Sequence, residues 1–123
     1  MKIQISDQRK IFEIQEGFSG LFPWLKLEFF SKFHKAGGGS PKIEMVPPFR
    51  TLGEVRTIHE SGTITITPSM TVAALENAFR DVYGLSVQVF RKSGKTWLET
   101  TVTDNWTLEH QNAQGKMLSE RLV

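Results

Sequence analysis

The fold is decided by residues 71–112, TVAALENAFRDVYGLSVQVFRKSGKTWLETTVTDNWTLEHQN, where a helical pattern is followed by a hairpin pattern. Thr71 has a hydroxyl that can cap the first turn of a helix, and Gly84 can end that helix in a left-handed conformation. Between them, apolar residues recur at steps of three, four and three, the spacing of one helix face: Val72, Leu75, Phe79 and Val82. This segment therefore predicts a helix with one buried side.

After Gly84 the apolar period changes to two, through Leu85, Val87 and Val89, as in a strand that covers a core on one face. Residues 91–95 predict a turn, and residues 96–102, rich in β-branched and aromatic side chains, predict the returning strand. Residues 107–112 predict a short helical tail. The unit is thus a helix followed by a two-stranded hairpin.

The same order of patterns occurs earlier in the chain. Residues 2–5 alternate like residues 63–66, and residues 50–53 correspond to residues 106–109. A second apolar stripe lies 61 residues before the first, and a strand pattern lies 60 residues before its counterpart: Ile11, Ile14, Phe18, Leu21, Leu25, Leu27 and Phe29. We interpret this as one domain over residues 1–123, with internal repeats at approximately 1–58 and 62–118. Chance similarity of amphipathic patterns is the alternative.

These units predict an α+β fold of duplicated strand–helix–hairpin units, with one sheet and two helices on one of its faces. In outline this is a ferredoxin-like arrangement enlarged by extra hairpin strands. A β-grasp-like pair of subdomains and a swapped dimer are the alternatives, because both use the same sequence signals.

Composition limits the classes of function. The 123 residues suffice for one hydrophobic core, and the net charge of +2 is too small to announce a nucleic-acid binder by itself. The absence of cysteine excludes disulfides and thiolate zinc sites and fits a reducing compartment. No run approaches the roughly 20 apolar residues of a membrane span. We therefore expect a cytoplasmic protein without membrane contact, metal or cofactor.

Basic residues gather at both predicted hairpins. Lys26, Lys32, Lys35 and Lys42 surround the first, and Arg91, Lys92 and Lys95 lie at the second. If the two hairpins lie together, their summed field would attract an anion or a nucleic-acid backbone. The alternative is that lysines at hairpin tips are solvated and protect edge strands from pairing with other chains.

Two side chains of the second hairpin share one strand face, namely Trp97 and Glu99. If Trp97 is exposed it can anchor a partner, whereas most tryptophans of small domains are largely buried. We predict a non-catalytic interaction module that binds a protein partner or associates with itself through edge strands and Arg91, Trp97 and Glu99. Nucleic-acid or other polyanion binding, through Arg91, Lys92, Lys95, Lys32 and Lys35, is the second prediction.

Catalytic patterns are weak. Glu99 and Asp104 could form an acid–base pair, which makes a hydrolase the third hypothesis, but Asp104-Asn105 is typical turn chemistry. The three histidines, at positions 34, 59 and 110, do not have metal-site spacing. No nucleophile motif is present.

The second repeat carries several motifs close together: VQVFRKSG at residues 87–94, WLETT at 97–101, TD at 103–104, WTLE at 106–109 and QN at 111–112. On these motifs the chain resembles a family of small uncharacterised bacterial proteins. The resemblance covers most of the chain, and the first repeat matches the more variable part of that family. It implies no activity, ligand or catalytic residue.

Overall fold

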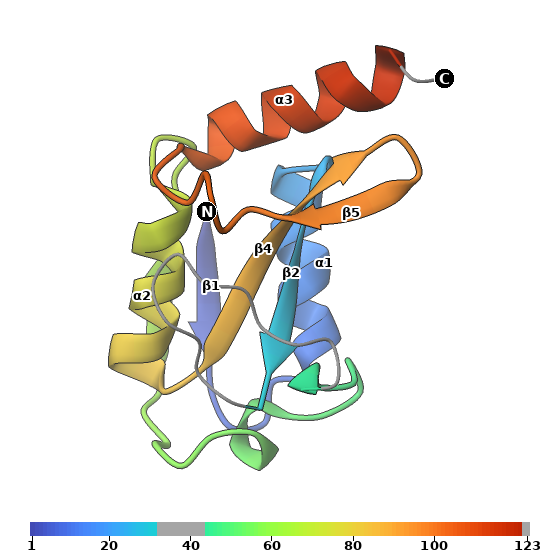
Figure 1. Cartoon of the computed structure of the whole chain (residues 1–123). Coiled ribbons are helices and arrows are strands. Elements are labelled where there is room, and N and C mark those ends of the chain that lie inside the picture. The colour runs from blue at the N-terminus through green and yellow to red at the C-terminus, as the bar shows by residue number, and fades with distance from the viewer. Residues whose placement is uncertain (32–43, 122–123) are drawn as a thin grey trace.

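The computed structural model describes residues 1–31 and 44–121, which form an α+β structure with two antiparallel sheets and three α-helices (Figure 1). The first sheet pairs β1 (Lys2–Ile5) with β3 (Gly62–Thr65). The second has the order β2 (Leu25–Phe30), β4 (Ser86–Ser93) and β5 (Thr96–Glu99). A short 3-10 helix, η2 (Leu52–Glu54), lies near the end of the first repeat.

The prediction of one sheet covered on one face is wrong for the strands that the structure describes. β1 and β3 pair with each other over their full length, and Ile3, Ile5 and Ile64 point from this small sheet into the same core that β2 and β4 enter. Two sheets facing one core remove the apolar faces of all four strands from water. A single sheet with helices on one face would leave the second face without that core.

Helices α1 (Ile11–Leu21) and α2 (Val72–Tyr83) flank the paired strands on opposite sides, with α1 packed along β2 and α2 along β4 (Figure 1). The predicted ends of α2 are confirmed, because the Thr71 hydroxyl accepts the Ala74 N–H at 3.1 Å and Gly84 has a φ of 64°. Both ends therefore follow local chemistry.

The last position of each predicted apolar stripe is wrong. Leu21 and Val82 are exposed, whereas Phe22 and Tyr83 are buried. A fourth residue after Phe18 or Phe79 lies closer to the buried direction than a third one does, because each residue advances the helix by about 100°. The core stripes thus end on aromatic residues.

The second hairpin is tighter than predicted. Gly94, with a φ of 63°, and Lys95 form the turn, so that residues 91–93 belong to β4. The returning strand β5 ends at Glu99 rather than at residue 102. The predicted tail at residues 107–112 is the start of a longer helix, α3 (Leu108–Arg121), which lies across the hairpin end of the three-stranded sheet (Figure 1).

Four backbone hydrogen bonds recur in the two halves of the chain. Ile11 and Phe12, the first residues of α1, donate to Arg50 and Pro48, as Val72 and Ala73 of α2 donate to Trp106 and Asp104. In the reverse direction, Leu52 and Gly53 donate to Arg9 and Asp7, as Leu108 and Glu109 donate to Met70 and Pro68. In both halves, a later segment of the chain therefore binds the start of the helix through the same set of backbone hydrogen bonds.

The strand registers also pair corresponding residues of the two halves of the chain. Ile3 lies opposite Ile64 in the first sheet, and Glu28 lies opposite Gln88 in the second. The first two residues are 61 positions apart and the second two are 60 positions apart, which are the offsets of the sequence pattern.

Candidate functional site

One face of the three-stranded sheet gathers lysine and aromatic side chains from all three strands. Lys26 of β2 lies opposite Phe90 of β4, which in turn lies opposite Glu99 of β5. Lys92 lies opposite Trp97 in the next row of the same face. Because side chains alternate along each strand, these five residues point to one side of the sheet.

The lysines of this face lie over the aromatic rings. The Nζ atom of Lys26 is 5.4 Å from the centroid of the Phe90 ring and 5.0 Å from that of Trp97, and Nζ of Lys92 is 5.5 Å from Trp97. Lys26 also forms an ion pair of 3.6 Å with Glu28. Each ammonium–ring contact contributes about 0.5–1 kcal/mol at such half-exposed positions. The indole of Trp97 thus contacts two cationic side chains.

A cavity of about 490 Å³ opens beside these side chains. We call it the lysine–aromatic groove, lined by Lys26, Phe30, Met45, Phe90, Lys95, Thr96, Trp97 and Glu99. Its base is aromatic, and its exposed members Lys95 and Glu99 provide charge at the rim. Such a mixture of apolar base and few charged groups suits an extended ligand with alternating side chains.

The outer edge of β5 adds backbone groups to this groove. Thr100 donates its N–H to the Val89 carbonyl at 3.3 Å, which makes Val89 and Thr100 a hydrogen-bonded pair. Bonded and non-bonded pairs alternate in an antiparallel ladder, so the pairs Phe90–Glu99 and Lys92–Trp97 are non-bonded. Trp97 and Glu99 therefore direct their N–H and C=O groups away from β4, toward the side of β5 on which no strand of the described residues pairs.

The structure separates the predicted site residues. Lys92, Lys95, Trp97 and Glu99 lie at the groove, together with Lys26. Arg91 points to the other face, where its Nη1 donates to Gln111 of α3 at 2.9 Å and its guanidinium carbon lies 5.6 Å from the Trp106 ring centroid. Arg91 thus joins α3 to the sheet. Lys32, Lys35 and Lys42 lie outside the described residues.

The carboxylates considered for catalysis, Glu99 and Asp104, act electrostatically on a different acidic residue. Glu76 of α2 accepts the Val89 N–H at 3.1 Å and the Gln88 side-chain N–H at 3.4 Å, at the place where β5 leaves the edge of β4. Burial, and then the negative charges of Asp104 and Glu99, raise the pKa of Glu76 to about 7. Glu76 accepts the Val89 N–H, to which a longer β5 would otherwise bond, so the role of Glu76 is structural.

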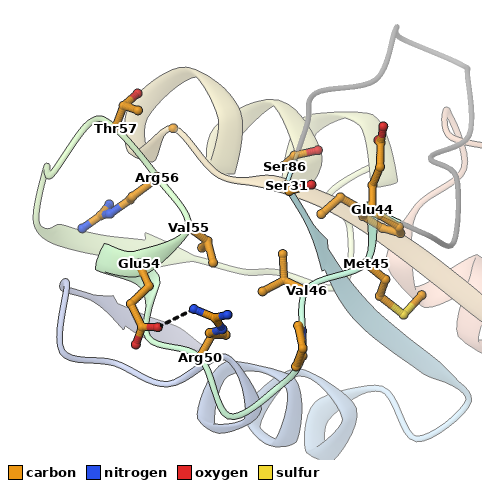
Figure 2. A pocket seen from close by; sticks show the side chains of 13 residues that line it. Ser31, Glu44, Met45, Val46, Arg50, Glu54, Val55, Arg56, Thr57 and Ser86 are labelled. Carbon is orange, nitrogen blue, oxygen red and sulfur yellow. Dashed lines mark hydrogen bonds and ion pairs between the residues drawn. The ribbon is translucent and has the colours of Figure 1, made fainter.

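A second cavity of about 540 Å³ lies where β2 ends and β4 begins, and it shares the lining residues Phe30 and Met45 with the lysine–aromatic groove (Figure 2). The Arg50–Glu54 ion pair of 3.0 Å lies at its mouth, and Val46 and Val55 provide apolar walls. Arg56 contributes to the lining, but its guanidinium points away from the cavity in Figure 2. The buried side chain of Arg56 donates to Asp7 and to the Tyr83 carbonyl instead.

Sequence reasoning missed the contacts of Asp7 and Glu76. The partners of Asp7 lie 49 and 52 residues away and those of Glu76 lie 12 and 13 residues away, and both residues resemble ordinary turn and helix-surface positions. The pairing of Glu76 with Gln88 has one sequence signal, since Gln15 and Glu28 occupy the corresponding positions of the first unit, where the Gln15 amide lies 3.5 Å from Glu28.

No group of three or more metal-ligating side chains occurs within residues 1–31 and 44–121. Across the same residues, every helix is too short or too polar to cross a bilayer. Comparisons of the chain with family models, curated proteins and solved structures return no match. The resemblance to the bacterial family stays a prediction.

Proposed function

We propose that this chain is a non-catalytic protein-binding module whose contact surface is the lysine–aromatic groove and the outer edge of β5. The observation that carries the proposal is the coincidence of two features at Trp97. Its side chain lies under the ammonium groups of Lys26 and Lys92, and its backbone N–H and C=O point toward the open edge of the sheet.

An extended protein segment fits both features. Its backbone would pair with β5, and every second side chain would lie over the groove. Because Lys26, Lys92 and Lys95 outnumber Glu28 and Glu99 at this face, the preferred segment carries acidic residues at alternate positions. Main-chain bonds would provide affinity and the lysines would provide selectivity.

Short labelled peptides test this function by fluorescence anisotropy. One peptide alternates Glu with Thr, a second alternates Lys with Thr, and a third alternates Ser with Thr. We expect the acidic peptide to bind best, and Trp97→Ala or Lys26→Gln to weaken it by roughly tenfold, which corresponds to about 1.4 kcal/mol. The matched control is Lys116→Gln, which removes the same charge from an exposed position of α3. Equal binding of all three peptides would contradict the proposal.

Polyanion binding is the second candidate, supported by the gathering of Lys26, Lys92 and Lys95 from two strands and a turn. Two observations favour the protein partner. The Trp97 ring already contacts two ammonium groups, which limits stacking of a base, and Glu28 and Glu99 place negative charge among the lysines. Oligonucleotide binding that falls steeply between about 50 and about 200 mM salt would favour the polyanion instead.

We further propose that the two halves of the chain arose by internal duplication. The four recurring hydrogen bonds at the helix starts support this, as do the pairings of Ile3 with Ile64 and of Glu28 with Gln88. If the halves are equivalent units, their order in the chain is immaterial. A permuted chain with residues 62–121 before residues 1–60, joined by a flexible linker, should therefore unfold cooperatively. Loss of cooperative unfolding would contradict equivalence.

A further inference from the structure

The partner that β5 itself fits is a second copy of this chain, and this inference rests on the proposed binding function. We propose that two chains pair through antiparallel contact of β5 with β5, so that the two three-stranded sheets become one continuous sheet. A symmetric pair of this kind is self-complementary only if the outward-pointing residues of one strand meet those of the other.

The backbone fixes which registers are allowed. Trp97 and Glu99 point their N–H and C=O groups outward, so a hydrogen-bonded pair must join two of these residues. Pairing Glu99 with Glu99 of the partner subunit would place like charges opposite each other, which is destabilising. Pairing Trp97 with Trp97 of the partner subunit would require the turn residue Lys95 to serve as a strand partner. The remaining register joins Trp97 to Glu99 of the partner subunit.

This register also matches the side chains. On the groove face, Glu99 of the partner subunit would lie beside Trp97 and its two lysines, Lys26 and Lys92, which supplies the acidic residue that the groove prefers. On the opposite face, Leu98 would lie across the twofold axis from Leu98 of the partner subunit. Leu98 is 44% exposed, and pairing would cover it.

The pairing places one residue close to its own copy, which gives a direct test. Residues in a non-bonded antiparallel pair have Cα atoms about 4.5 Å apart, which lies within the range that a disulfide can bridge. The chain contains no cysteine, so a single introduced cysteine can form a disulfide only with the same residue of a second chain. The test compares Leu98→Cys with Val102→Cys, whose site is 92% exposed and lies just beyond β5.

Sedimentation velocity should show a concentration-dependent dimer of the unmodified chain. Under mild oxidation, Leu98→Cys should form a disulfide-linked dimer at least about tenfold faster than Val102→Cys, because only the first pair is held at bonding distance. A monomer at all concentrations would overturn the proposal. Equal cross-linking rates of the two variants would overturn it as well, since random collision would then explain both.

Glu99→Pro removes an N–H that points away from β4, so it should abolish the dimer and leave the hairpin paired. Glu99→Gln is its control and should retain the backbone bonds, with weaker association. Should Glu99→Pro lose its native circular dichroism, Leu98→Arg replaces it, because it puts two like charges across the axis. A dimer that survives a folded disrupting variant would overturn the proposal.

The two proposals fail separately. A monomeric chain that still binds the acidic peptide retains the protein-binding function and loses only the second copy as its partner. A dimeric chain whose Leu98→Arg monomer does not bind the acidic peptide retains the pairing and loses the wider function.

Discussion

Asp7 and Arg56 are 49 residues apart in sequence, yet the Asp7 carboxylate accepts hydrogen bonds from Nε and Nη2 of Arg56 at 3.1 and 2.8 Å. The Arg56 side chain has no solvent exposure and also donates to the Tyr83 carbonyl at the end of α2. His59 binds the second oxygen of the same carboxylate at 2.8 Å. These contacts join the segment after β1 to the segment after η2 and to α2.

Asp7→Ala should therefore destabilise the fold, because it leaves the buried guanidinium of Arg56 without its anion. Urea unfolding measures the loss, and Glu54→Ala is the matched control, since Glu54 pairs with an exposed arginine. The His59 and Arg56 hydrogen bonds lower the pKa of Asp7 below 3.8. The advantage of the unmodified chain over Asp7→Ala should thus be complete above pH 3.8 and vanish as the pH falls through the lowered pKa. Equal losses in Asp7→Ala and Glu54→Ala would contradict this account.

Glu76 should give the opposite pH dependence. Its pKa rises from 4.5 to about 7 on folding, so the folded chain holds a proton that the unfolded chain releases between these values. Stability should therefore decrease as the pH rises from 4.5 to about 7, by at most about 3 kcal/mol. Glu76→Gln retains an acceptor for the Val89 N–H and should abolish this decrease. Unfolding midpoints measured across this pH range decide the point, and an unchanged slope in the variant would contradict it.

Gly115 permits the close packing of α3 on the sheet. A Cβ atom at this position would lie 3.0 Å from the Trp24 carbonyl oxygen and 3.1 Å from Cγ of Arg91. Gly115→Ala should lower stability by about 1–3 kcal/mol, because the backbone of Trp24 must move. Gly20→Ala in α1 meets nothing within 4 Å and should instead raise stability by about 0.5 kcal/mol. Thermal unfolding of both variants checks the contrast, and a stabilised Gly115→Ala would refute the packing argument.

Leu52 and Leu108 occupy corresponding positions of the two halves, and both are fully buried. Each follows a threonine that bridges to the residue before a helix, Lys10 or Thr71. Leu52→Ala and Leu108→Ala should each cost about 2–5 kcal/mol in unfolding free energy, through lost burial and a residual cavity. Phe49→Ala, at a side chain that is 65% exposed, is the control and should change little. A cost below about 1 kcal/mol at either leucine would show that it does not anchor its segment.

Local patterns predicted α2 well, since the chemistry of its two ends is contained in neighbouring residues, whereas they predicted α3 only as a short tail at residues 107–112. Thr71, Gly84 and the repeated apolar spacing specify where α2 begins and ends, and the structure confirms those limits. The hairpin was predicted less well in detail. Its turn at Gly94 and Lys95 is set by the strand register, in which Ser93 pairs with Thr96.

The candidate site was predicted in part. Lys92, Lys95, Trp97 and Glu99 belong to one hairpin, so their proximity follows from strand alternation alone. Lys26 joins them only because β2 pairs with β4, and Arg91 leaves them only because α3 covers the other face. Neither fact can be predicted from the local pattern of residues 71–112.

The sequence by itself determined the order of the helices and strands and most of the residues that they bury, because helix and strand periods depend on backbone geometry over a few residues. Only the tertiary structure decided that β1 pairs with β3 in a separate sheet and that Arg56 finds Asp7 across 49 residues. These choices depend on which apolar faces close over one core and on which buried charge must be neutralised. Both are properties of the whole chain.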